Sequence, residues 1–65
     1  MSSGDDRLAD LVHDLRTPLA VVAGFAELLE RRAGHLTDEQ RAEYVDRIRV
    51  AADRMNELLD EALGI

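Results

Sequence analysis

The side chains best suited to chemistry lie in one short stretch, His13-Asp14-Leu15-Arg16-Thr17-Pro18-Leu19. A neutral imidazole is a good nucleophile near pH 7, and a neighbouring carboxylate can fix its tautomer. The Thr17 hydroxyl comes four residues after His13, which is one turn further along the same face of a helix. The stretch therefore predicts a nucleophilic histidine with an acid and a hydroxyl beside it.

Two carboxylates are candidates for orienting the imidazole. Asp14 is the immediate neighbour of His13, but adjacent residues of a helix do not face each other directly, so contact requires a bent rotamer. Asp10 lies one turn earlier on the same face as His13. A solvated acid is the simpler interpretation of Asp14, and periodicity alone does not exclude Asp10 as the orienting carboxylate. His35 has no partner nearby and is assigned no role.

Pro18 falls inside a helical pattern, where a proline costs about 3 kcal/mol or more. It removes the amide that would bond to the Asp14 carbonyl, so we expect a kink in the helix just below His13. A loosened turn beside a reactive side chain is more easily explained by function than by folding.

The spacing of apolar residues predicts an all-α fold in a single domain, 1–65, with two helices at 5–33 and 38–63 after a disordered start at 1–4. In the loop, 34–37, Gly34 suits a left-handed C-cap, and Thr37 with Gln40 forms a capping box. A loop this short requires an antiparallel hairpin.

The apolar seam of the first helix runs at heptad spacing from Leu8 to Leu29. His13 falls opposite this seam and should face water, where an ordinary surface histidine is the plain alternative to a functional one. Small and apolar residues continue below it, where a solvated face usually carries charge. We interpret them as a candidate docking surface for another protein, with ordinary surface residues as the alternative: Ala20, Val21, Gly24 and Leu28.

The composition narrows the class of protein. A chain of 65 residues rarely buries enough apolar surface alone, so its broad stripes favour a homodimer that forms a four-helix bundle. The net charge of -6 disfavours nucleic acid and anionic lipid as partners. There is no cysteine, and two distant histidines suggest no metal site. No apolar run could span a bilayer and no signal peptide is evident, so we expect a cytoplasmic location.

The acidic end of the second helix predicts a longer parent protein. Asp60 and Glu61 oppose the helix dipole there, so we expect this helix to continue beyond Ile65.

The stretch from His13 to Leu19 resembles the phosphoacceptor box of bacterial sensor histidine kinases, and the resemblance extends from about Leu8 to Leu63. The family pattern is His, an acid, Leu, Arg, Thr or a similar polar residue, Pro and Leu. This chain matches it at all seven positions, with Asp14 in place of the commoner glutamate.

The resemblance implies a role for each polar residue. His13 would accept the γ-phosphoryl group of ATP and pass it to an aspartate of a response regulator. Asp14 would hydrogen-bond the other ring nitrogen and share its proton. Thr17 would position water when the partner is dephosphorylated.

The resemblance also implies a larger protein-histidine kinase of a two-component system. A separate domain of the same protein would bind ATP and magnesium, and this chain would hold no cofactor or metal itself. The implied partners are a second copy of the chain, that ATP-binding domain and a receiver domain. Two alternatives stay open: a free-standing histidine phosphotransfer relay, and a non-catalytic helical connector. Pro18 argues against the connector, which gains nothing from a kink.

Overall fold

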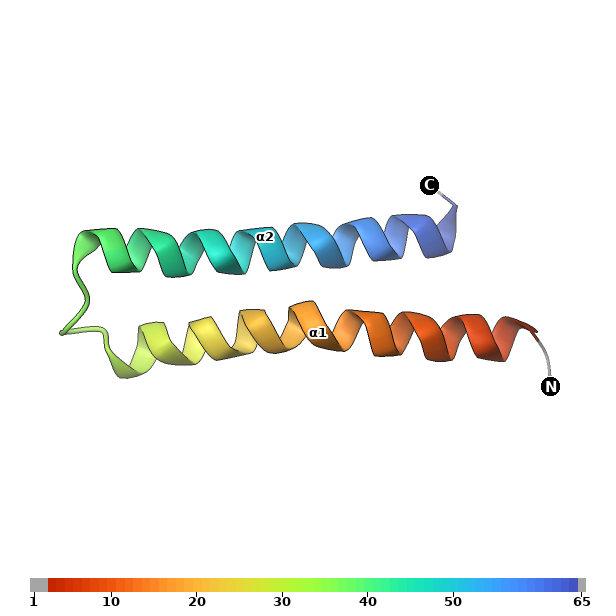
Figure 1. Cartoon of the computed structure of the whole chain (residues 1–65), viewed down its shortest axis with the longest axis horizontal. Coiled ribbons are helices and arrows are strands. Elements are labelled where there is room, and N and C mark those ends of the chain that lie inside the picture. Colours follow the sequence, from red (N-terminus) through yellow and green to blue (C-terminus); the bar gives the residue numbers. More distant parts are fainter. Residues whose placement is uncertain (1–2, 65) are drawn as a thin grey trace.

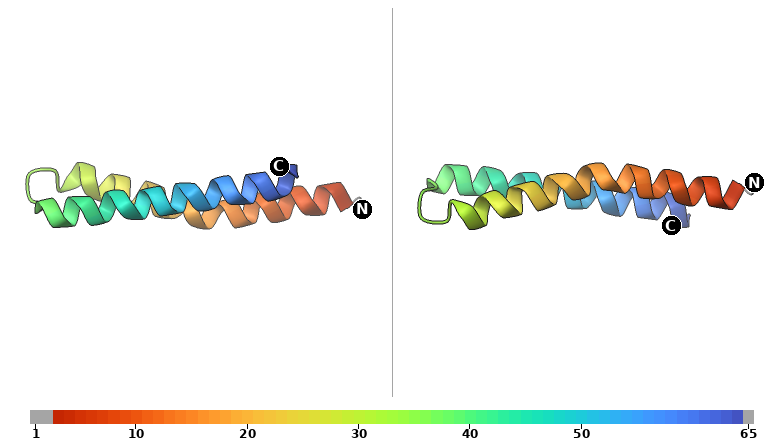
Figure 2. Two further views of the ribbon diagram at one scale, coloured as in Figure 1. Left: turned by 90° about the horizontal axis from the view of Figure 1, so that it is seen from above. Right: turned by 90° about the horizontal axis from the view of Figure 1, so that it is seen from below.

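The computed structural model describes residues 3–64 as a hairpin of two helices (Figure 1). Helix α1 spans Ser3–Arg31 and helix α2 spans Asp38–Leu63. They lie side by side, run antiparallel and cross at a shallow angle, so the start of α1 and the end of α2 are at the same end of the molecule (Figures 1 and 2). The hairpin measures 51 × 21 × 10 Å. The predicted all-α hairpin is therefore confirmed.

The first helix differs at both ends from the predicted range, 5–33. It already includes Ser3 and Gly4, so the predicted disordered start is wrong for these two residues, while residues 1–2 lie outside the described range. The first amides of a helix need no intrahelical acceptor, so the helix can extend over polar residues without losing hydrogen bonds. At the other end α1 stops at Arg31, two residues before the predicted end.

The connection between the helices begins with a tight turn. The Arg32 N–H still donates to the Leu28 carbonyl at 3.0 Å, and the His35 N–H then donates to the Arg32 carbonyl at 2.8 Å. Gly34 does not have a positive φ, so its predicted left-handed C-cap is wrong. The turn from Arg32 to His35 explains this, because an i to i+3 hydrogen bond forms readily with negative φ at both central residues.

The start of α2 is held by the predicted capping box. The Thr37 hydroxyl accepts from the Gln40 N–H, and the Gln40 side chain accepts from the Thr37 N–H, each at 3.0 Å. The Arg41 guanidinium reaches back to donate to the Ala33 carbonyl at 3.3 Å. These bonds satisfy backbone groups that a helix terminus leaves without partners and tie the connection to α2.

Helix α2 ends at Leu63 because Gly64 turns left-handed, with φ 71°. The Gly64 N–H donates to the carbonyls of Asp60 and Glu61, which closes the last turn. The expected continuation of the helix is therefore interrupted at Gly64, and Ile65 lies outside the described range.

The core between the helices is thin. Of the described residues only Pro18, Ala51 and Leu58 are buried. The Phe25 and Tyr44 rings meet across the seam, with centroids 5.3 Å apart and planes inclined by 53°. The other residues of the α1 seam are half-buried except Leu8, which is 61% exposed, because a two-helix layer covers each apolar stripe from one side only.

One side of the hairpin stays apolar and open to solvent. Its large side chains are between 39% and 68% exposed, and heptad spacing puts those of the two antiparallel helices along the same edge. We call this surface the apolar flank and define it as Leu8, Val12, Leu19, Val45, Leu59 and Leu63.

Over the described range, neither helix combines the length and apolar character that a bilayer crossing requires.

Replacing Thr37 by Ala should lower the free energy of unfolding by about 1 kcal/mol, because the Gln40 amide loses its side-chain acceptor. Thr37→Ser keeps the hydroxyl and should unfold close to the parent chain. Thermal unfolding followed by circular dichroism, at one fixed protein concentration, compares the three proteins. An alanine variant as stable as the parent would contradict the role of the cap.

Candidate functional site

His13 lies in the first half of α1 with its side chain exposed. This is the placement expected for a residue opposite the seam. Its imidazole forms no ion pair with Asp10 or Asp14 in the described part of the chain. The ring is therefore open to an incoming reactant, and both carboxylates stay candidates for orienting it.

A groove of about 490 Å³ runs between the helices beside the His13–Leu19 stretch. We call it the Thr17 groove. Its wall from α1 consists of Asp14, Thr17, Pro18 and Val21, and its wall from α2 consists of Arg47, Val50, Ala51, Arg54 and Leu58. Residues far apart in the sequence thus form one surface next to the exposed histidine.

A second groove, of about 460 Å³, continues toward the ends of the chain. It contains Asp10 and Asp14 from α1 and Glu61 from α2, together with Arg7. Asp14 lines both grooves, so it stands where they meet. Within residues 3–64, no group of three or more potential metal ligands comes together at either groove.

Pro18 does not end the helix. Helix α1 continues through it, and the residue is buried against α2 at the floor of the Thr17 groove. A proline has no N–H, so the Asp14 carbonyl loses its usual helical partner one turn above. The expected kink at this position stays a prediction.

The predicted docking residues differ in exposure and in their relation to the Thr17 groove. Val21 lines the Thr17 groove, Leu28 is half-buried, and Ala20 and Gly24 are exposed outside the groove walls. Sequence reasoning missed the α2 wall altogether. Heptad spacing within each helix could have identified the side of α2 that carries these residues, but it could not align them with Thr17.

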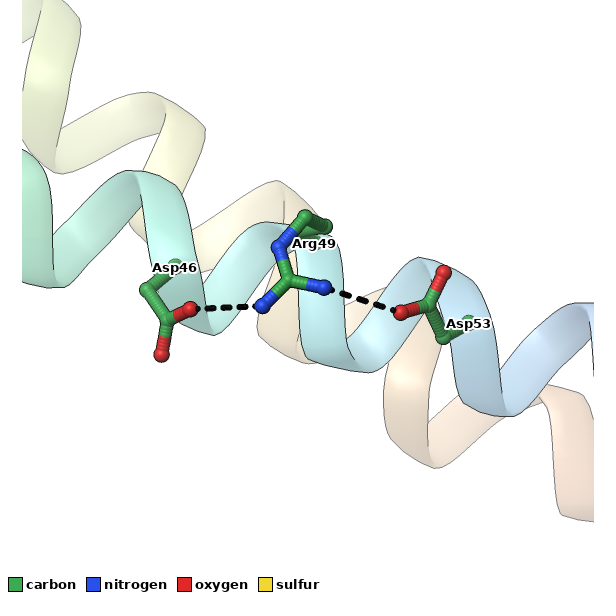
Figure 3. A network of polar contacts seen from close by, with 3 residues as sticks. All are labelled: Asp46, Arg49 and Asp53. Atoms are coloured by element: carbon green, nitrogen blue, oxygen red, sulfur yellow. Dashed lines mark hydrogen bonds and ion pairs between the residues drawn. The ribbon is translucent and has the colours of Figure 1, made fainter.

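The arginines of α2 fall into two groups. Arg49 lies outside the groove walls, where its guanidinium bonds the Asp46 carboxylate at 2.9 Å and the Asp53 carboxylate at 3.3 Å (Figure 3). Arg47 and Arg54 belong to the groove wall instead. All these side chains are more than half exposed, so their ion pairs orient them and add little stability, about 0–1 kcal/mol each.

Comparison with known proteins gives consistent matches. Residues 5–64 match the family described as the His Kinase A (phospho-acceptor) domain. The chain is 41% identical over 59 residues to the circadian input-output histidine kinase CikA of Synechococcus elongatus, a match that covers 89% of this chain and 8% of that protein. It is 34% identical over 60 residues to the sensor protein DivL of Caulobacter vibrioides, covering 92% of this chain and 8% of that protein. No solved structure matches it significantly.

The chain thus spans a small part of the length of each curated relative, while nearly all of its own length is matched. The family match, the helical hairpin and the exposed histidine within a complete seven-residue box agree with one another. The chain belongs to the His Kinase A family, the phosphoacceptor domain of sensor histidine kinases.

Proposed function

We propose that His13 is the phosphoacceptor of this domain and that the domain works within a larger protein-histidine kinase. The observation that carries the proposal is the exposed imidazole of His13, which stands at the first position of the box in a chain of this family. A separate domain of the same protein would bind ATP and magnesium and present the γ-phosphoryl group to His13.

The chemistry follows from a neutral imidazole. The ring nitrogen that carries the lone pair attacks the γ-phosphorus, a nitrogen–phosphorus bond forms, and the bond to the bridging oxygen breaks as ADP leaves with its electron pair. The other ring nitrogen keeps its proton and shares it with a carboxylate, which stabilises the positive charge that develops on the ring. Asp14 takes this role in the proposal, with Asp10 as the rival.

The second step regenerates the histidine. An aspartate oxygen of a response-regulator receiver domain attacks the phosphorus, the nitrogen–phosphorus bond breaks, and the ring nitrogen recovers its electron pair. Thr17 lies in the groove beside this position, where its hydroxyl can hold a water molecule during dephosphorylation of the receiver. The receiver would dock along the Thr17 groove, which includes Val21, and over the exposed Ala20 and Gly24 and the half-buried Leu28.

The proposal includes a homodimer in which the apolar flank is covered by a second hairpin. Only three described residues of this chain are buried, namely Pro18, Ala51 and Leu58. Small chains usually need a partner to bury sufficient apolar surface, and two such hairpins form a four-helix bundle. The flank lies on the opposite side of the seam from the Thr17 groove, so dimerisation leaves that groove open.

His13→Gln should abolish acid-labile phosphorylation of the chain by ATP and the ATP-binding domain of the parent protein. His35→Gln is the matched control, because His35 is an exposed residue of the connection between the helices and should label normally. Helicity should be unchanged in both variants, as judged by circular dichroism. Labelling that persists without His13, or that is lost without His35, would refute the assignment.

Asp14→Asn should slow phosphorylation of His13 by about 10²–10⁴-fold, the usual loss when general acid–base help is removed. Thr17→Ala should leave that rate largely intact and lower phosphatase activity toward the receiver. Single-turnover rates with the separate ATP-binding domain as donor compare these variants with Asp10→Asn. If Asp10→Asn is the slow variant and Asp14→Asn is near normal, the orienting role belongs to Asp10.

Leu19→Asp should dissociate the dimer, because it places a charge within the apolar flank. Ala20→Asp adds the same charge at the next exposed position, which lies away from the seam, and should leave the dimer intact. Sedimentation equilibrium should then give one chain mass, 7.2 kDa, for the first variant and twice that mass for the second. Equal masses for the two variants would exclude the flank as the interface.

A further inference from the structure

The second groove gathers three carboxylates around one cation. Asp10 and Asp14 line it from α1 and Glu61 lines it from α2, while Arg7 is the one arginine among its lining residues. All four residues are exposed, so their side chains can change rotamer without any movement of the helices. Both carboxylates that could orient His13 thus share a groove with the same arginine.

Helical spacing places Asp10 between Arg7 and His13. Arg7 precedes Asp10 by three residues and His13 follows it by three, and each of these steps turns the side chain by about 60° around the helix axis. Residues three apart are neighbours on a helix surface. An arginine followed three residues later by an acid already forms an ion pair in this chain, between Arg54 and Glu57 at 3.2 Å. Asp10 can therefore turn toward either neighbour, but not toward both at once.

Asp14 has no arginine as a neighbour on its own helix face. The residues three and four positions away from it are Asp10, Leu11, Thr17 and Pro18. Arg7 is seven residues away, about 10 Å along the helix. Across the Thr17 groove, Arg54 is already paired with Glu57. The Asp14 carboxylate is therefore more available to the imidazole of His13 than its position beside two grooves suggests.

We propose that Arg7 is a positioning residue that holds the Asp10 carboxylate away from His13 and thereby leaves the orienting role to Asp14. This inference rests on the proposed phosphorylation of His13. Arginine carries a full charge, whereas the imidazole is neutral before it reacts, so Coulomb attraction favours Arg7 as the partner of Asp10. No ion pair among the described side chains involves Arg7 or Asp10, so no other partner has to be displaced. The hold is partial, because exposed ion pairs are weak and Glu61 competes for the same guanidinium.

The test separates this inference from the proposed function. Phosphoramidate loads the full chain without ATP or an ATP-binding domain: a ring nitrogen bonds to phosphorus, and the phosphorus–nitrogen bond of the donor breaks as ammonia leaves. If the parent chain is not labelled, or if His13→Gln is labelled equally, the proposed function fails before Arg7 is tested. If Asp14→Asn is labelled at the parent rate, this inference is overturned while the phosphorylation of His13 stands.

The decisive variants are made in the slow Asp14→Asn chain, where Asp10 is the carboxylate that remains for His13. Adding Arg7→Gln should raise the rate of loading by about two- to fivefold at low salt, the change in population that a weak exposed ion pair produces. Arg7→Lys keeps the charge and should stay as slow as Asp14→Asn alone. Adding Asp10→Asn to the Arg7→Gln chain should abolish the gain, which a merely structural effect of Arg7 would not explain.

Arg49→Gln in the same Asp14→Asn chain is the matched control. It removes the same charge from α2, where Asp46 and Asp53 hold Arg49 outside the walls of both grooves (Figure 3), and it should give no gain. Circular dichroism should show equal helicity in all variants. The inference is overturned if Arg7→Gln gives no gain, if the gain persists without Asp10, or if Arg49→Gln gives an equal one.

Discussion

The apolar seam between α1 and α2 is the interaction on which the rest of the molecule depends. It buries Pro18, Ala51 and Leu58 and brings Phe25 against Tyr44, and it thereby decides which faces of both helices stay in water. The seam is thin, since two helices cover each other from one side only. The exposed apolar flank follows from that thinness, and it is the surface that a second hairpin would cover.

Because the two helices are aligned along the seam, residues of both helices form the site. The connection ends α1 with a tight turn and starts α2 with the Thr37 capping box, so the second helix begins at a defined point. As a result Thr17 shares a groove with Arg54. A change in the length of the connection would move the arginines along the groove without altering either helix.

The site combines an open nucleophile with an irregular point in the backbone. His13 is exposed and is free of ion pairs with the nearby carboxylates, which suits its proposed role as a side chain that reacts with two different partners in turn. Pro18, one turn beyond Asp14, is buried at the floor of the groove and leaves the Asp14 carbonyl without its helical donor. The proline therefore destabilises α1 locally, in the part of the helix where the proposed partners bind.

The sequence by itself determined the two helices, the capping box at Thr37, the outward placement of His13 and the family. These features depend on local spacing and side-chain chemistry, which can be recognised in a single sequence. The backbone conformation of the connection was predicted less well from the sequence, because the turn from Arg32 to His35 has a negative φ at Gly34 and not the left-handed conformation that a glycine there suggests. Only the tertiary structure placed Arg47, Val50 and Arg54 opposite Thr17, since periodicity gives the face of each helix but not how far one helix is shifted along the other.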